Sequence, residues 1–148
     1  EKYLYLESFS EKFRNIVSSL NKQQAELFSC IDLLFFVEGS FYQYLPQKNF
    51  VFMWEKNGKK IVDRISEWLS VDFEDKIVVI PIFVPIRKML FFGEYGYREA
   101  MIDYGRVLSE ITHSVSDAKI IRRFETRAMN EKFRLDSVEK SILSIISC

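Results

Sequence analysis

The chain has 148 residues, and its 21 lysines and arginines balance 21 aspartates and glutamates. A net charge of zero argues against a surface built to bind DNA or RNA, which needs an excess of cations. Hydrophobic residues make up 48% and aromatic residues 16% of the chain, so a disordered chain is excluded and a large aromatic core is expected. The length suits a single domain over 1–148.

Histidine and cysteine are too scarce for several kinds of site. Cys30 and Cys148 make neither a disulfide framework nor a metal cluster, and the single His113 excludes a multi-histidine zinc site. No apolar run approaches the ~18 residues of a membrane span, and no signal peptide is found. We therefore expect a cytoplasmic protein with no metal and with neither nucleic acid nor membrane as a partner. The chain begins at Glu1 rather than at a methionine, so a preceding segment stays open.

Apolar spacing predicts the elements in chain order. Phe9, Phe13, Val17 and Leu20 recur every three or four residues and predict a helix, with Ser8 or Ser10 as its cap. Strands are expected over 31–37, 41–45, 50–54, 77–84, 118–124 and 141–147. Because Pro81 has no N–H to donate, the fourth strand must have an edge or a bulge there.

Three helices complete the prediction. The first follows Asn57-Gly58 and has an apolar side formed by Ile61, Ile65, Trp68 and Leu69. A long helix over 97–113 contains Gly105, which would permit the close approach of a helix or a ligand. Thr126 to Phe133 forms a short helix. Six side chains of the long helix are expected to face inward: Ala100, Met101, Tyr104, Val107, Leu108 and Ile111. This mixture of hairpin, helices and separated strands indicates the α+β class.

Three stretches then suggest a family. They are Gly39–Pro46 (GSFYQYLP), Phe92–Gly105 (FGEYGYREAMIDYG), and Lys119–Glu125 (KIIRRFE) with a following Leu-Asp. In this order they resemble the nitroreductase superfamily, and most closely the flavin-dependent azoline dehydrogenases that oxidise thiazoline and oxazoline rings in ribosomal peptides. The resemblance implies a mixed sheet with a long central helix, a dimer, and FMN bound between subunits.

The chain departs from that family at three places. Azoline dehydrogenases carry a Lys-Tyr pair just before the first glycine of the second stretch, where this chain has Phe91 and Phe92. Neither phenylalanine can move a proton. The family's N-terminal Ser-Arg-Arg segment, which binds the flavin phosphate, is not found. The loop over 23–28, where the family has a glycine-containing loop, has no glycine and carries the negative charge of Glu26. The resemblance therefore implies a truncated or degenerate form.

Individual residues allow a functional and an ordinary interpretation. Phe91 and Phe92 either reshape a pocket or simply pack in the core. Arg122 and Arg123 either bind a flavin phosphate or an acidic partner, or are solvated. Tyr42 and Tyr44 either form a platform for a ligand or belong to a half-buried strand. Cys30 is expected to be a core thiol, and His113 to cap the end of a helix. Charge pairs on the surface of the long helix are expected among Glu94, Arg98, Glu99, Asp103 and Arg106.

Two functions follow from the resemblance. In the first, the chain is a non-catalytic binding or structural subunit that needs no cofactor. It would form a homodimer or a heterodimer with a nitroreductase-like paralogue, and could dock a cyclodehydratase or a precursor peptide. In the second, it is an FMN-dependent oxidoreductase completed by a partner chain. An unrelated α+β interaction domain is a third interpretation.

Overall fold

The computed structural model describes residues 3–21, 30–45 and 50–148. Its sheet has the strand order β1-β4-β3-β2-β5-β8-β6, with β7 also paired to β5. The strands are β1 (Tyr3–Tyr5), β2 (Ile31–Val37), β3 (Ser40–Leu45), β4 (Phe50–Glu55), β5 (Val78–Phe83), β6 (Lys119–Ile121), β7 (Ser141–Ile142) and β8 (Ile145–Ser147). The α+β class is confirmed.

Every pairing between these strands is antiparallel, where a mixed sheet was expected. The hairpin connections from β2 to β3 and from β3 to β4 necessarily reverse the chain. The connection from β4 through α2 to β5 also returns antiparallel to β2, so no parallel crossover arises.

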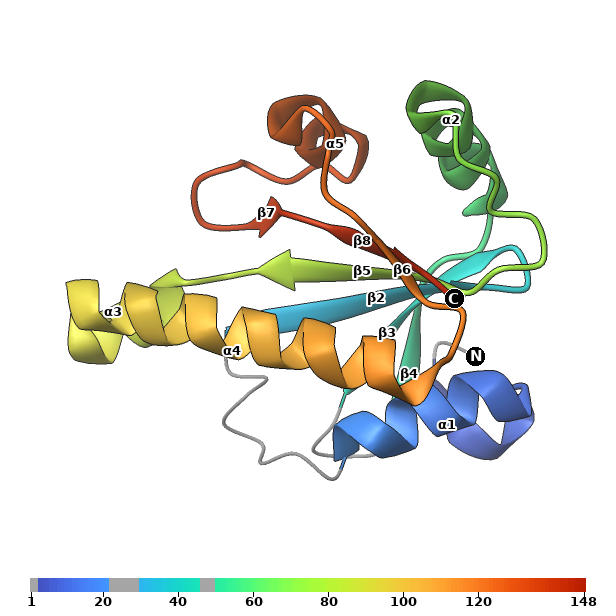
Figure 1. Cartoon of the computed structure of the whole chain (residues 1–148), viewed down its shortest axis with the longest axis horizontal. Helices are drawn as coiled ribbons and strands as arrows, with labels where there is room; N and C mark the ends of the chain where they lie inside the picture. Colours follow the sequence, from blue (N-terminus) through green and yellow to red (C-terminus); the bar gives the residue numbers. More distant parts are fainter. Residues whose placement is uncertain (1–2, 22–29, 46–49) are drawn as a thin grey trace.

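Helices cover both faces of the sheet, as Figure 1 shows: α1 and α4 lie on one face, and α2 and α5 on the other. The helices are α1 (Glu11–Asn21), α2 (Lys59–Leu69), α3 (Ile86–Phe92), α4 (Glu94–Ser114) and α5 (Thr126–Lys132), with a short 3-10 turn at Leu6–Ser8. α1 starts at the predicted cap, because the Phe13 N–H donates to Ser10 Oγ at 3.4 Å.

The sheet separates two apolar clusters. Phe13, Phe35 and Tyr104 belong to the cluster under α1 and α4. Phe41 and Phe133 belong to the cluster under α2 and α5. Phe13, Val17 and Leu20 are fully buried, which confirms the inward face of α1, whereas Phe9, also expected on this face, is buried just before the helix begins.

The proline in β5 disturbs the neighbouring strand rather than β5 itself. β5 lies inside the sheet, so an edge at Pro81 is wrong. Val79 pairs with Ile146 and Ile82 with Ile142, so two residues of β5 lie opposite three of the C-terminal segment. The expected strand over 141–147 is therefore split into β7 and β8 by a bulge opposite the residue that cannot donate.

The long helix and its surroundings differ from the prediction. α4 begins three residues earlier than expected, and α3, which was not predicted, precedes it. Met101, expected to face inward, is 41% exposed, whereas Ala100, Tyr104, Val107 and Ile111 are buried. No described atom lies within 4 Å of a Cβ built on Gly105, so the expected close approach is not made within the described part of this chain.

Candidate functional site

The segment with the Phe-Phe pair forms a tight corner between α3 and α4, at the left of Figure 1. Gly93 ends α3 with a φ of +59°, a conformation that L side chains rarely adopt. Gly96 lets the two helices touch, because a Cβ there would lie 2.5 Å from the Lys88 carbonyl oxygen. The two glycines therefore fix the direction in which the α3 side chains point.

Phe91 and Phe92 face away from the protein. Their exposed fractions are 82% and 59%, so the expectation that they pack in the core is wrong. The ring centroids lie 6.4 Å apart. Leu90 and Tyr95 beside them are also exposed, at 75% and 60%. The α3–α4 surface, defined by these four residues, is apolar and lacks an ionisable group at both phenylalanine positions.

A buried ion pair lies on the inner side of the same corner. The Lys88 ammonium contacts the Asp103 carboxylate, whose side chain is only 5% exposed, and Arg106 approaches the same carboxylate at 3.8 Å. Asp103 was expected in a surface pair at helical spacing, and its pair with Arg106 three residues later is present, but Asp103 itself is buried. It points inward because it shares the buried face of α4 with Ala100 and Val107.

A second ion pair joins α3 to the sheet. Arg87 donates two hydrogen bonds to Asp32 of β2, at 2.7 and 2.8 Å. The hydrogen bond to Asp32 raises the pKa of the Arg87 guanidinium. Arg87 and Lys88 are therefore both held in ion pairs on the inner side of α3. Sequence spacing gave no signal for either pair.

Tyrosine and cysteine side chains near the sheet are structural. Tyr42 and Tyr44 are buried in the cluster under α1 and α4, and Phe41 of the same strand is buried in the cluster under α2 and α5. β3 is therefore buried on both faces rather than half-buried, and the two tyrosines present no exposed platform for a ligand. Burial raises the pKa of Tyr104 to about 12, and its hydroxyl lies 2.6 Å from Ser144 Oγ. Cys30 is fully buried, and burial raises the pKa of its thiol.

The two arginines proposed for phosphate binding lie just after β6. Arg122 and Arg123 are exposed, and among the described residues no ion pair involves either of them. Binding of a flavin phosphate by these arginines stays a prediction. His113 is exposed near the end of α4, where its Nδ1 lies 2.7 Å from the Ser109 carbonyl oxygen. The loop with Glu26 lies outside the described residues.

The described residues contain neither a metal-binding cluster nor a helix that could span a membrane. Within residues 3–21, 30–45 and 50–148, no group of three or more histidine, cysteine, aspartate or glutamate side chains could hold a metal ion. None of the helices in these ranges is both long and apolar enough to cross a membrane.

Neither a protein-family model nor a curated protein matches the chain. Solved structures do match, and the three that follow each have a TM-score of 0.64. A candidate nitroreductase from Anabaena variabilis is 18% identical, over 81% of this chain and 27% of its own. A chain of the Escherichia coli microcin synthetase complex McbBCD, with truncated pro-MccB17 bound, is 13% identical over 82% of this chain and 51% of its own. A candidate nitroreductase from Ralstonia eutropha is 9% identical over 91% of this chain and 71% of its own.

The chain thus spans about a quarter of the first of these structures and about half of the second. At these identities the likeness concerns the fold. The chain has the nitroreductase fold, with the long helix α4 packed on one face of the sheet.

Proposed function

We propose that the chain is a non-catalytic, nitroreductase-like subunit that binds other proteins within a peptide-modifying assembly. The observation that supports this proposal is the α3–α4 surface. It is strongly apolar and exposed, and it includes the two positions at which the resemblance implies a Lys-Tyr pair. Without an acid or base at Phe91 and Phe92, the chain lacks general acid–base catalysis there, which is typically worth 10²–10⁴-fold in rate.

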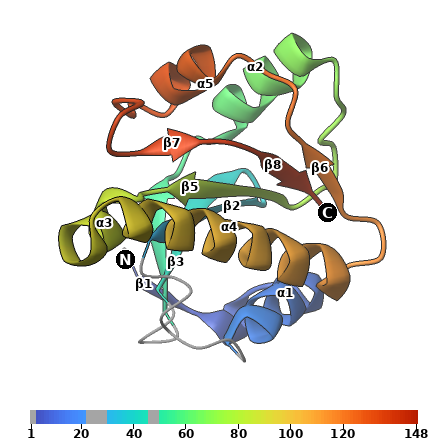
Figure 2. The ribbon, with the colours of Figure 1, turned by 60° about the vertical axis from the view of Figure 1, so that its left-hand side comes forward.

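The exposed apolar area is large enough for a protein interface. Tyr97, Met101 and Ile102 of α4 are also 41–50% exposed. Taken with the α3–α4 surface, these side chains expose roughly 800 Å², if an aromatic side chain has about 200 Å². Monomers rarely leave apolar patches above about 600 Å², and one side of a standard interface is about 800 Å². In Figure 2, α3 and α4 run across the front of the molecule, and no described element covers them.

Charged residues of both signs lie near this apolar area, which favours a partner whose surface is also apolar with mixed charges. Glu94 and Arg98 on the outer side of α4 are exposed and carry opposite signs. A second copy of the chain or a nitroreductase-like paralogue can match such a mixed surface better than a strongly charged partner can. A cyclodehydratase or a precursor peptide would extend the assembly, and the matched McbBCD structure is itself a complex with a peptide bound.

A second candidate function is an FMN-dependent azoline dehydrogenase or other oxidoreductase completed by a partner chain. The exposed Arg122 and Arg123 favour it, because a phosphate prefers free guanidinium groups. The residues at the proton-transfer positions do not fit it. FMN would supply hydride transfer, and a partner chain would have to supply the acid and the base.

Light scattering and an absorbance spectrum of the purified chain distinguish the two functions. We expect no flavin absorbance in the purified chain, and none that stays with the chain when it is incubated with FMN and unbound FMN is removed by gel filtration. The mass should exceed the 17.6 kDa of one chain. The double variant Phe91→Ser/Phe92→Ser should be monomeric or should lose its partner. Val138→Ser is the matched control, because Val138 is also 82% exposed but lies in the segment between α5 and β7.

Stoichiometric FMN binding with turnover of an azoline substrate would overturn the proposal. A wild-type chain that stays at 17.6 kDa and captures neither a paralogue nor a cyclodehydratase would overturn the binding role.

A further inference from the structure

A cavity of about 770 Å³ lies at the end of β2 that is farther from α3. Its walls come from α2, the turn between β2 and β3, the segment over 72–77 and the start of α1. Its volume falls in the range of sites that bind small molecules, about 300–1,000 Å³. None of these walls belongs to the α3–α4 surface, so the cavity is independent of the proposed function.

The inner wall of the cavity is apolar. Phe36, Val62, Phe73 and Ile77 line it, and each of these residues is less than a tenth exposed. Two aromatic rings and two aliphatic side chains offer van der Waals contact to a hydrocarbon group that enters. The cavity therefore fits the apolar part of a ligand.

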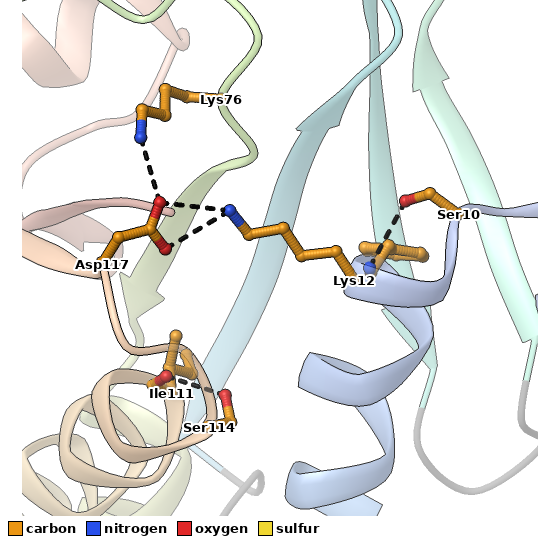
Figure 3. Close-up of polar contacts among 7 residues, drawn as sticks. Ser10, Lys12, Lys76, Ile111, Ser114 and Asp117 are labelled. Carbon is orange, nitrogen blue, oxygen red and sulfur yellow. Dashed lines mark hydrogen bonds and ion pairs between the residues drawn. The ribbon is translucent and has the colours of Figure 1, made fainter.

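Three lysines line the cavity, and all three are already ion-paired. The Lys59 Nζ lies 3.1 Å from Asp63 Oδ1 within α2. Figure 3 shows Asp117 between the other two, with Lys12 at 3.3 Å and Lys76 at 3.1 Å from its carboxylate oxygens. The lysines thus offer little uncompensated positive charge to a ligand.

The carboxylates of the cavity are less well compensated. Glu38, Asp72, Glu74 and Asp75 line it as well, and among the described residues no ion pair involves any of them. Asp72 accepts a hydrogen bond from the Glu74 backbone N–H, at 2.8 Å. The rim therefore combines hydrogen-bond acceptors with an excess of negative charge, which disfavours a phosphate and favours a cation with N–H donors.

We propose that this cavity binds a guanidinium or ammonium group carried on an apolar stem. The stem packs on Phe36 and Phe73, and the cationic group donates hydrogen bonds to Glu74, Asp75 and Glu38 at the rim. This chemistry occurs in the arginine or lysine side chain of a peptide and in a free alkylguanidinium or alkylamine.

Chemical shifts of the ¹⁵N-labelled full chain test the proposal. The probes are n-butylguanidinium, the blocked peptide acetyl-Gly-Arg-Gly-amide, and the same peptide with citrulline, a neutral isostere of arginine. We expect the two cations to shift the amides of Gly39, Phe73 and Lys76, whereas citrulline leaves them in place. Raising the salt concentration should weaken the binding, because the rim is solvent-exposed. Stronger binding of the peptide identifies a peptide as the ligand, and stronger binding of n-butylguanidinium identifies a free cation.

A pair of charge-matched variants provides the control. Glu74→Gln/Asp75→Asn should weaken binding of the cations about fivefold, since two exposed ion pairs are lost. Glu67→Gln/Glu139→Gln removes the same charge from exposed positions outside the cavity and should leave the affinity unchanged. The proposal is overturned if neither cation shifts these amides at about 10 mM, if citrulline binds equally well, or if both variants behave alike. None of these results bears on flavin binding or on the mass of the assembly.

Discussion

The contact between α3 and α4 can be tested with two glycine-to-alanine variants of the same helix. A Cβ on Gly96 would lie 2.5 Å from the Lys88 carbonyl oxygen and 2.9 Å from the Met89 nitrogen, so the backbone of α3 would have to move. Such overpacking costs about 1–3 kcal/mol, while alanine gains up to about 1 kcal/mol over glycine in a helix. We expect Gly96→Ala to destabilise the protein by about 1–2 kcal/mol.

Gly105→Ala should instead stabilise the protein. No described atom lies within 4 Å of its new Cβ, so only the helix preference remains, and a gain of about 0.5–1 kcal/mol is expected. Urea unfolding followed by circular dichroism should therefore separate the two variants by about 2 kcal/mol. Amide exchange of α3 would detect a helix that detaches locally instead. The reasoning fails if Gly96→Ala is as stable as Gly105→Ala and α3 stays equally protected.

Three further predictions concern charged and nucleophilic groups. Lys88→Met should cost about 2–4 kcal/mol in urea unfolding, because it leaves the Asp103 carboxylate buried without its main partner, and Lys88→Met/Asp103→Leu should recover most of this loss. Hydrogen bonds from Lys76 and Lys12 lower the pKa of Asp117 below its ordinary value of 3.8. The ionised Asp117 therefore stabilises the folded protein above pH 3.8, and this stabilisation is lost as the pH falls through the lowered pKa of the folded state. Asp117→Asn should flatten this acid limb of the stability profile. Burial raises the pKa of Cys148 to about 11 and also raises that of Cys30, so both thiols should react with a disulfide reagent at least about 100-fold faster in urea than in the native state. Native thiols that react as fast as unfolded ones would contradict this burial.

Elements with a strong apolar period were predictable from the sequence. α1 could be predicted from its periodic apolar residues Phe13, Val17 and Leu20. The hairpin of β3 and β4 could be predicted from alternating aromatic residues before and after a turn signal. α3 was missed because Ile86–Phe92 has only seven residues, too few for a helical period to stand out, and because none of its residues is buried. Its conformation depends on Gly93 and on packing against Gly96, which local propensity does not report.

The candidate site was only partly predictable for a similar reason. The resemblance singled out Phe91 and Phe92, but exposure is decided by the direction of α3, and a phenylalanine is more often buried. The pairing of Lys88 with Asp103 joins two helices across a sharp corner, so neither helix alone shows a pattern for it. The cavity near Phe73 combines four separate segments and could be found only once the chain was folded.

The place of β5 in the strand order has a kinetic consequence. Its partners in β2 precede it by about 40–50 residues, and its partners in β7 and β8 follow it by about 60–70 residues. Each pairing must close a long loop before any hydrogen bond compensates for the lost chain entropy. We therefore expect refolding on the millisecond-to-second scale, slower than helical proteins of this size. Until β5 is enclosed, its six apolar residues remain open to strands of other chains, so the yield of native protein should fall as the refolding concentration rises.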